Sequence, residues 1–207
     1  MLSRNRAKRV TAQEFWHAFR QSIDSYLSIT PEWIQWYACD RLWTKEISGV
    51  IEATTARLGY TRGENEFSSE FYRVDYCCYS FEMLKEGMVT WDLELAIEHE
   101  NNGRSWHEEW IKLASFNCGL RVVISYAHEI DSISPESPAL AKAEILASRR
   151  KYAQDAGKWL LILGAAYRES MTTCHFVAFS FDEGGFVKLP DSPIQPSVPS
   201  VGPPGPS

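Results

Sequence analysis

Residues 91 to 100 alternate between apolar and acidic side chains, and this alternation restricts the fold more than any other feature of the sequence. The apolar positions are Trp91, Leu93, Leu95 and Ile97, and the acidic positions are Asp92, Glu94, Glu98 and Glu100. Successive side chains of a β-strand point to opposite faces, so a period of two predicts a strand with one apolar face and one acidic face. Neighbouring carboxylates repel one another unless solvent or a cation separates them. Two interpretations stay open: a half-exposed edge strand with a hydrated acidic face, and a site for a divalent metal ion.

The N-terminal third of the chain predicts helices. Thr11 and Glu14 have the spacing of a capping box, and the apolar positions that follow predict an amphipathic helix ending near Ser28. Residues 30 to 59 predict one long helix or two shorter ones, with Gly59 as the C-terminal stop. The aromatic side chains of this stretch could stack on nucleic-acid bases, but we favour packing between helices.

The middle of the chain predicts strands and a crossover helix. Residues 70 to 100 predict a β-hairpin or meander, and a second capping box at Ser105 and Glu108 predicts a helix that continues up to Gly119. The apolar run at 120 to 126 predicts a buried strand. Strand, helix and strand together have the length of a βαβ unit, so the two flanking strands should be parallel.

The complete pattern predicts one α/β domain with a mixed central sheet flanked by helices. The remaining elements are a helix over 137–155 and core strands over 158–167 and 175–181. The predicted domain spans residues 11–189, between a basic N-terminal arm at 1–10 and a disordered Pro-rich tail at 190–207.

Composition restricts the class of protein. A chain of 207 residues with 44% apolar content can bury one sizeable core. The net charge of -6 argues against nonspecific binding of nucleic acid through overall charge, although a local basic surface stays possible. Five cysteines without a C-x-x-C pair predict reduced thiols, and the lack of a long apolar run or secretory signal predicts a cytoplasmic protein with no membrane partner. No P-loop, dinucleotide-binding or nucleophile-elbow motif occurs.

Two acidic segments resemble a known family. Asp75 in the first part of the meander and Glu98-His99-Glu100 in the next strand, followed by the helix and apolar strand, resemble the PD-(D/E)XK, or restriction-endonuclease-like, superfamily over about residues 44–126. In that family, an Asp on one strand and an acidic residue two positions before a Lys on the neighbouring strand bind Mg²⁺ and activate water for phosphodiester cleavage. Residues i and i+2 share a strand face, so Glu98 and Glu100 should project together, and a neighbouring strand could bring Asp75 beside them.

The resemblance implies a restriction-endonuclease-like core and a metal-dependent nuclease that acts on DNA or RNA. Asp75, Glu98 and Glu100 would be the catalytic residues and the ligands of Mg²⁺ or Mn²⁺, hard cations that prefer oxygen. Glu100 or a metal-bound hydroxide would act on the attacking water. The sequence departs from the family pattern because Glu100 stands where the usual Lys would be, which makes this an E-x-E variant.

Further residues near the motif are candidate accessories. Lys112, on the following helix, could supply a displaced cation, although a surface lysine is the simpler interpretation. Glu46 corresponds best to the additional Glu that family members often carry on the preceding helix, while Arg73 would pair with a carboxylate and Asn101 follows the acidic strand. His99 has the parity of the apolar face, so we expect a hydrogen-bonded histidine in the core or facing the hairpin, and not a metal ligand.

A second function also fits this sequence. Without the usual Lys and with an acidic pI near 5.4, the chain could be a catalytically inactive nuclease-fold binding or accessory module, immunity-like, that holds a protein or nucleic acid. Neither the oligomeric state nor a choice between DNA and RNA can be read from these residues.

Overall fold

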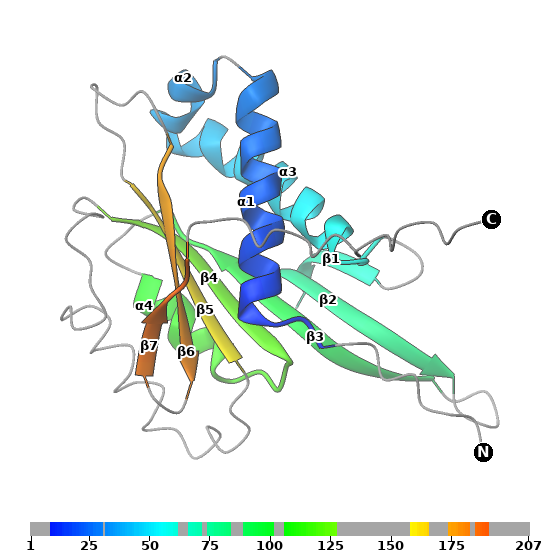
Figure 1. Cartoon of the computed structure of the whole chain (residues 1–207). Helices are drawn as coiled ribbons and strands as arrows, with labels where there is room; N and C mark the ends of the chain where they lie inside the picture. The colour runs from blue at the N-terminus through cyan, green and yellow to red at the C-terminus, as the bar shows by residue number, and fades with distance from the viewer. Residues whose placement is uncertain are drawn as a thin grey trace, which may run out of the picture.

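A mixed β-sheet covered by helices on both faces forms the body of the protein (Figure 1). The computed structural model describes residues 9–30, 32–61, 66–71, 74–83, 89–101, 106–127, 158–165, 174–182 and 185–190. Several predictions lie outside these ranges: most of the N-terminal arm, Arg73, Ser105, the helix over 137–155 and the Pro-rich tail after residue 190. The predicted α/β class is confirmed.

The described part of the chain contains seven strands in the sheet order β1-β2-β3-β4-β5-β6-β7. Their bounds are β1 Glu66–Phe71, β2 Val74–Met83, β3 Val89–His99, β4 Leu120–Ala127, β5 Lys158–Ala165, β6 Phe176–Asp182 and β7 Gly185–Lys188. The first three strands form an antiparallel meander, β3, β4 and β5 run parallel, and β6 and β7 return antiparallel. The predicted meander, the parallel strand-helix-strand unit and the two later core strands are confirmed, whereas β7 was not predicted.

The helices within the described residues are α1 Ala12–Ile29, α2 Trp33–Tyr37, α3 Asp40–Arg57 and α4 Trp106–Leu113. The capping box is confirmed, since the Glu14 backbone N–H donates to Thr11 Oγ1 at 3.1 Å and the Thr11 N–H donates to the Glu14 carboxylate at 2.9 Å. Two helices, not one, occupy residues 33–57, and Gly59 follows with a φ of 91°, a left-handed conformation that glycine adopts at low cost. Within the described ranges, no helix combines the length and apolar character needed to cross a membrane.

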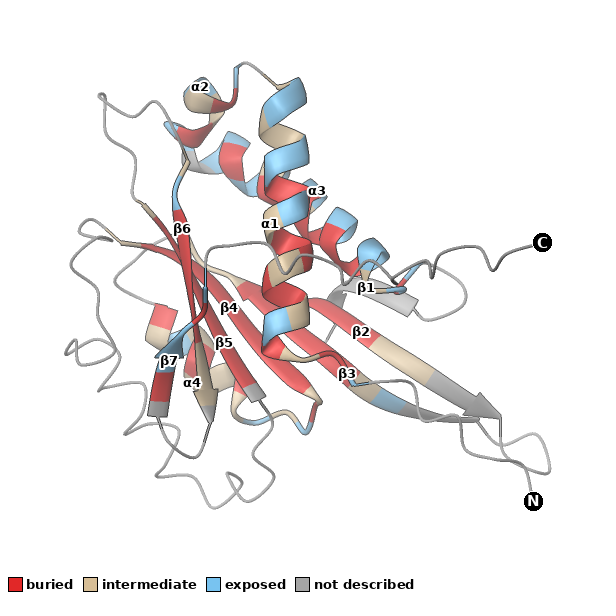
Figure 2. Cartoon of the chain, viewed as in Figure 1, coloured by how far each residue is buried: buried red, intermediate tan, exposed pale blue. Residues whose placement is uncertain are grey.

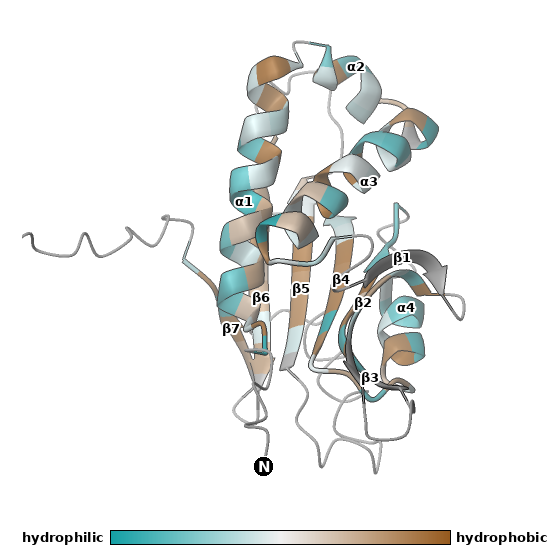
Figure 3. Cartoon of the chain, turned by 90° about the vertical axis from the view of Figure 1, so that its right-hand side faces the viewer, coloured by the Kyte–Doolittle hydropathy of each residue, from teal (hydrophilic) through white to brown (hydrophobic). Residues whose placement is uncertain are grey.

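The helices form two layers around the sheet. Figure 3 shows α1 and α3 on one side of the strands and α4 on the other side. Each side has its own hydrophobic core, and Figure 2 shows buried positions along β4 and β5 and on the inner faces of α1 and α3. Three aromatic side chains of α2 and α3 belong to the core between the sheet and helices α1 and α3. Trp33, Tyr37 and Trp43 are buried there, and the rings of Tyr37 and Trp43 lie 4.5 Å apart. Their predicted packing role is confirmed.

Strand β3 is a central strand, so the prediction of a hydrated edge strand is wrong. It pairs with β2 on one side and with β4 on the other. Its acidic face is covered in the middle, where Glu94 is 8% exposed and Glu98 only 1%, whereas Asp92 is exposed. Alternation of apolar and polar residues normally marks a strand with one wet face, but here helix α4 lies over the acidic end of that face.

Helix α4 ends at Leu113, six residues before the predicted stop at Gly119. The buried Arg121 of β4 explains the early end, because its guanidinium donates hydrogen bonds to the backbone carbonyls of Leu113 and Phe116. Carbonyls that lack a helical partner are thereby satisfied. Gly119 has another role: a Cβ atom there would lie 2.8 Å from the backbone oxygen of Glu94, so only glycine allows the close approach to β3.

Candidate functional site

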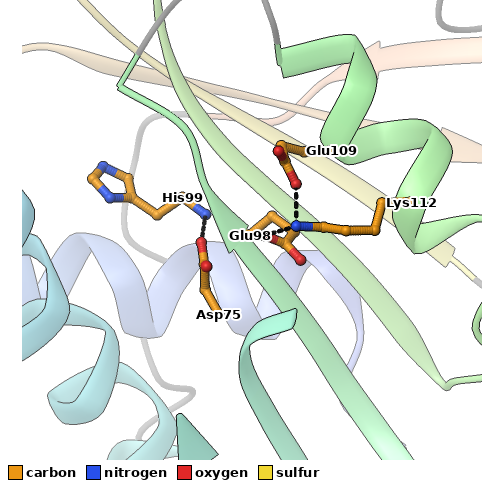
Figure 4. Close-up of polar contacts among 5 residues, drawn as sticks. All are labelled: Asp75, Glu98, His99, Glu109 and Lys112. Atoms are coloured by element: carbon orange, nitrogen blue, oxygen red, sulfur yellow. Dashed lines mark hydrogen bonds and ion pairs between the residues drawn. The ribbon is translucent and has the colours of Figure 1, made fainter. Parts of the chain in front are cut away.

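Asp75 of β2 and Glu98 of β3 are brought together by the antiparallel pairing of the two strands. Tyr76 pairs with Ile97, so one step further along the same register Asp75 stands opposite Glu98. The Asp75 carboxylate is half-buried and accepts a hydrogen bond of 2.9 Å from the backbone N–H of His99 (Figure 4). Its negative charge is close enough to raise the pKa of Glu98. Two of the three predicted carboxylates therefore share one place in the sheet.

Glu98 lies at the centre of this group. Its side chain is only 1% exposed, and its Oε2 atom lies 2.8 Å from the Lys112 ammonium of α4. The other oxygen, Oε1, is buried and makes no hydrogen bond within the described part of the chain. A buried polar atom without a partner is uncommon in native proteins, so this oxygen is available to a ligand.

Lys112 connects Glu98 to a second carboxylate on its own helix. Its ammonium forms an ion pair with Glu109, three residues earlier, as well as with Glu98 (Figure 4). The Lys112 side chain is 32% exposed, compared with 21% for Glu109. The interpretation of Lys112 as an ordinary surface lysine is therefore wrong, because it reaches a buried carboxylate from the next helix.

Burial and charge act against each other at these groups. Burial raises the pKa of Glu98, the hydrogen bond from Lys112 lowers it, and the charges of Asp75 and Glu109 raise it again, with a net increase. Burial alone would lower the pKa of Lys112, but its hydrogen bonds to Glu109 and Glu98 more than offset this effect and raise it. The site thus disfavours a bare negative charge on Glu98 and favours a positive charge beside it.

Two of the other predicted residues, Asn101 and Glu46, have separate surroundings. The Glu100 backbone N–H donates to the carbonyl of Ile124 at 2.9 Å, which extends the parallel pairing by one residue. The Asn101 amide donates to the Thr44 hydroxyl on α3. Glu46 accepts a hydrogen bond of 2.9 Å from the Tyr26 hydroxyl, so it faces α1. These contacts place Asn101 and Glu46 at the helices and not beside Glu98.

His99 faces the opposite side of the sheet from Glu98. Its Nε2 atom lies 2.9 Å from the hydroxyl of Tyr126, which also accepts a hydrogen bond from the Trp43 indole. Burial lowers the pKa of His99, so the ring is neutral in the folded protein. The prediction of a hydrogen-bonded core histidine is confirmed.

The described residues offer a metal ion two carboxylates and not a complete set. No group of three or more His, Cys, Asp or Glu side chains in these ranges is placed to hold a metal ion together. The ligand set of Asp75, Glu98 and Glu100 stays a prediction. Mg²⁺ usually keeps several waters and binds through one or two carboxylates plus substrate phosphates, so Asp75 with the unpaired Oε1 of Glu98 fits such an ion.

Two residues at the site were not predicted from the sequence. Glu109 precedes Lys112 by three positions, a spacing that places two helical side chains on one face and could have identified the pair. Arg121 fixes the end of α4, and its guanidinium also lies 5.1 Å from the ring centre of Trp159. Arg121 is the one charged residue in the apolar run at 120–126, and nothing in the sequence indicates that it caps the end of α4.

Comparisons with family models, curated proteins and solved structures found no significant match. The resemblance to the PD-(D/E)XK superfamily therefore rests on the sequence motif alone.

Proposed function

We propose that this protein is a metal-dependent phosphodiesterase of the nuclease type, with Asp75, Glu98 and Lys112 at its site. The observation that carries the proposal is the contact of 2.8 Å between Lys112 and the buried Glu98, next to Asp75 on the adjoining strand. The strand Lys of the PD-(D/E)XK pattern is absent at position 100, and Lys112 supplies an ammonium group to the same carboxylate from α4. The order of one helix, three strands, a crossover helix and a parallel strand also supports a restriction-endonuclease-like core.

Asp75 and Glu98 would hold Mg²⁺ or Mn²⁺, which when bound polarises phosphate and activates water. In hydrolysis, the water oxygen bonds to phosphorus and loses one proton, the ester P–O bond breaks, and the leaving oxygen takes up one proton, so that the proton count balances. Lys112 would donate a hydrogen bond to a non-bridging phosphate oxygen and stabilise the charge that develops there. Because Glu98 is almost fully buried, a phosphate would approach from the side of Asp75 and Lys112, which are the more exposed groups.

One observation favours a second function, an inactive nuclease-fold binding or accessory module. Lys112 already compensates the charge of Glu98 without any metal ion, which is consistent with a catalytically inactive site. In that case Lys112 would stay on Glu98 permanently, and the protein would act by holding a nucleic acid or a protein partner.

A cleavage assay separates the two functions. We expect the wild-type protein to cut at least one of four polymers, single- or double-stranded DNA or RNA, with Mn²⁺ or Mg²⁺ and not with EDTA. Asp75→Asn and Glu98→Gln should each lower the rate by at least about a hundredfold, because each removes a charge that holds the cation. Glu108→Gln on the exposed side of α4 is the matched control and should cut like the wild type.

Cleavage by Asp75→Asn and Glu98→Gln at the wild-type rate would contradict the proposed site. Failure of the wild-type protein to cut any polymer with either metal would contradict the nuclease function and leave the binding module.

A further inference from the structure

Lys112 occupies the position of a counter-ion for a buried carboxylate. Its ammonium lies 2.8 Å from Glu98 Oε2, while Glu98 is 1% exposed and its Oε1 atom has no hydrogen-bond partner in the described ranges. A buried carboxylate is costly unless a cation or hydrogen-bond donors compensate it. In this structure the compensating cation belongs to the protein.

The same ammonium has an alternative partner within reach. Glu109 forms an ion pair with Lys112 across one turn of α4, and its side chain as a whole is 21% exposed compared with 1% for Glu98, although the oxygen that contacts Lys112 is itself buried. Lys112 itself is 32% exposed and sits on a four-carbon chain with several rotatable bonds. Lys112 can therefore withdraw from Glu98 towards solvent and keep its contact with Glu109.

Two cations cannot share Glu98 at close range without repulsion. Two positive charges within a few ångströms of each other near a protein surface repel more strongly than in bulk water, because the dielectric there is lower. A divalent ion on Asp75 and Glu98 would therefore compete with Lys112 for the same carboxylate. The outcome of that competition depends on where Lys112 can go.

We infer that Lys112 is an internal counter-ion that bridges Glu98 and Glu109 in the metal-free protein and keeps only its contact with Glu109 when a divalent cation binds, with Glu109 as its positioning residue. This inference rests on the proposed metal site. We call this release of Lys112 from Glu98, with its contact to Glu109 kept, the lysine latch, or simply the latch. Lys112 would then have two opposing effects. It weakens binding of the cation, but once the cation has bound, it can donate a hydrogen bond to the substrate phosphate and so favour cleavage. Removing Lys112 should strengthen cation binding and weaken cleavage.

Calorimetric titration with Mn²⁺ tests the latch without relying on activity. Lys112→Met and Lys112→Gln should bind Mn²⁺ roughly tenfold more tightly than the wild type, because the competing cation is gone, while Lys112→Arg should stay near the wild type. Lys45→Met, an exposed lysine of α3, is the matched control. Unfolding curves for each variant establish that it is folded before the titration.

Glu109→Gln tests the positioning role. Its loss should weaken Mn²⁺ binding by about threefold, because Lys112 then has Glu98 as its remaining carboxylate partner among the described contacts. In the Lys112→Met background the same change should have little effect, since Glu109 acts through Lys112. An equal loss of affinity in both backgrounds would show that Glu109 acts on the cation directly, and would overturn its positioning role.

The latch and the proposed function fail in different ways. Wild-type binding of Mn²⁺ combined with unchanged or weaker binding by both Lys112→Met and Lys112→Gln overturns the latch and leaves the metal site in place. No binding of Mn²⁺ by the wild type or by either variant, at millimolar concentration, overturns the metal site and the latch together.

Discussion

Removing the charge of Glu98 should change how stability depends on pH. Burial raises the pKa of Glu98 from its ordinary value of 4.5 to about 9 in the folded protein, partly opposed by Lys112. Over this window the folded state binds a proton that the unfolded state has released. The contribution of Glu98 to stability is therefore fully present below about pH 4.5 and is lost as the pH rises towards 9.

The size of the effect follows from the linkage relation. One titrating group changes the free energy of unfolding by at most about 1.4 kcal/mol per pH unit between its two pKa values. From about pH 6 to about pH 8, the loss due to Glu98 would be up to about 2.7 kcal/mol. For a domain of this size, that corresponds to a decrease in Tm of roughly 5 to 10 °C.

Glu98→Gln removes the pH-dependent contribution of Glu98 to the free energy of unfolding and keeps the shape of the side chain. The Gln side-chain carbonyl can still accept a hydrogen bond from Lys112. We expect the metal-free variant to gain stability relative to the wild type between pH 6 and pH 8, by up to about 3 kcal/mol. Urea unfolding in EDTA, at both pH values, measures the difference, with Glu108→Gln as the charge-matched control. Parallel stability curves for Glu98→Gln and the wild type would refute the reasoning, because Glu98 would then titrate alike in the folded and unfolded chains.

Two further predictions concern the support of the site. Gly119→Ala should destabilise the protein by about 1 to 3 kcal/mol, because its Cβ would press on the backbone oxygen of Glu94, whereas Gly49→Ala in the interior of α3 meets no atom within 4 Å and should stabilise it by about 0.5 to 1 kcal/mol. Thermal unfolding of both variants measures whether Tm falls for Gly119→Ala and rises for Gly49→Ala. A change of Tm in the same direction for both would contradict the close approach of Gly119 to Glu94. Arg121→Met should cost about 3 kcal/mol in urea unfolding, because two carbonyls at the end of α4 lose their donors. Unchanged stability would mean that water replaces the guanidinium there.

The local signals of the sequence were enough to predict most elements. The capping box at Thr11, the stop at Gly59 and the parallel strands around the crossover helix are all local or spaced by one supersecondary unit. Such signals depend on backbone and capping chemistry within a few residues, which the sequence displays directly.

The environment of β3 could not be predicted in the same way. Its alternation is the pattern of a strand with one wet face. Glu98 is instead covered because α4 packs over it, fixed by the stacking of Trp110 on Trp159 at 4.1 Å and by Arg121. The stacked pair Trp110 and Trp159 is distant in sequence, so no short window of sequence contains that contact, and the partners of Arg121 depend on where α4 ends.

Part of the candidate site could be predicted from the sequence, and part needed the three-dimensional structure. The opposition of Asp75 and Glu98 follows from the predicted neighbouring strands, and their interaction agrees with the predicted pairing. The contact of Lys112 with Glu98 needed the position of α4 over the sheet, and an exposed lysine on a helix is normally hydrated. Glu109 could have been found from its spacing to Lys112, but its relevance appears only once Lys112 is placed beside Glu98.

Binding of Mn²⁺, followed by electron paramagnetic resonance, tests the central claim that Asp75 and Glu98 form one cation site. The account predicts saturable binding of about one ion per chain in the wild type, weakened at least about tenfold by Asp75→Asn and by Glu98→Gln. Binding that is absent at millimolar Mn²⁺, or that is equally strong in both variants, would contradict it.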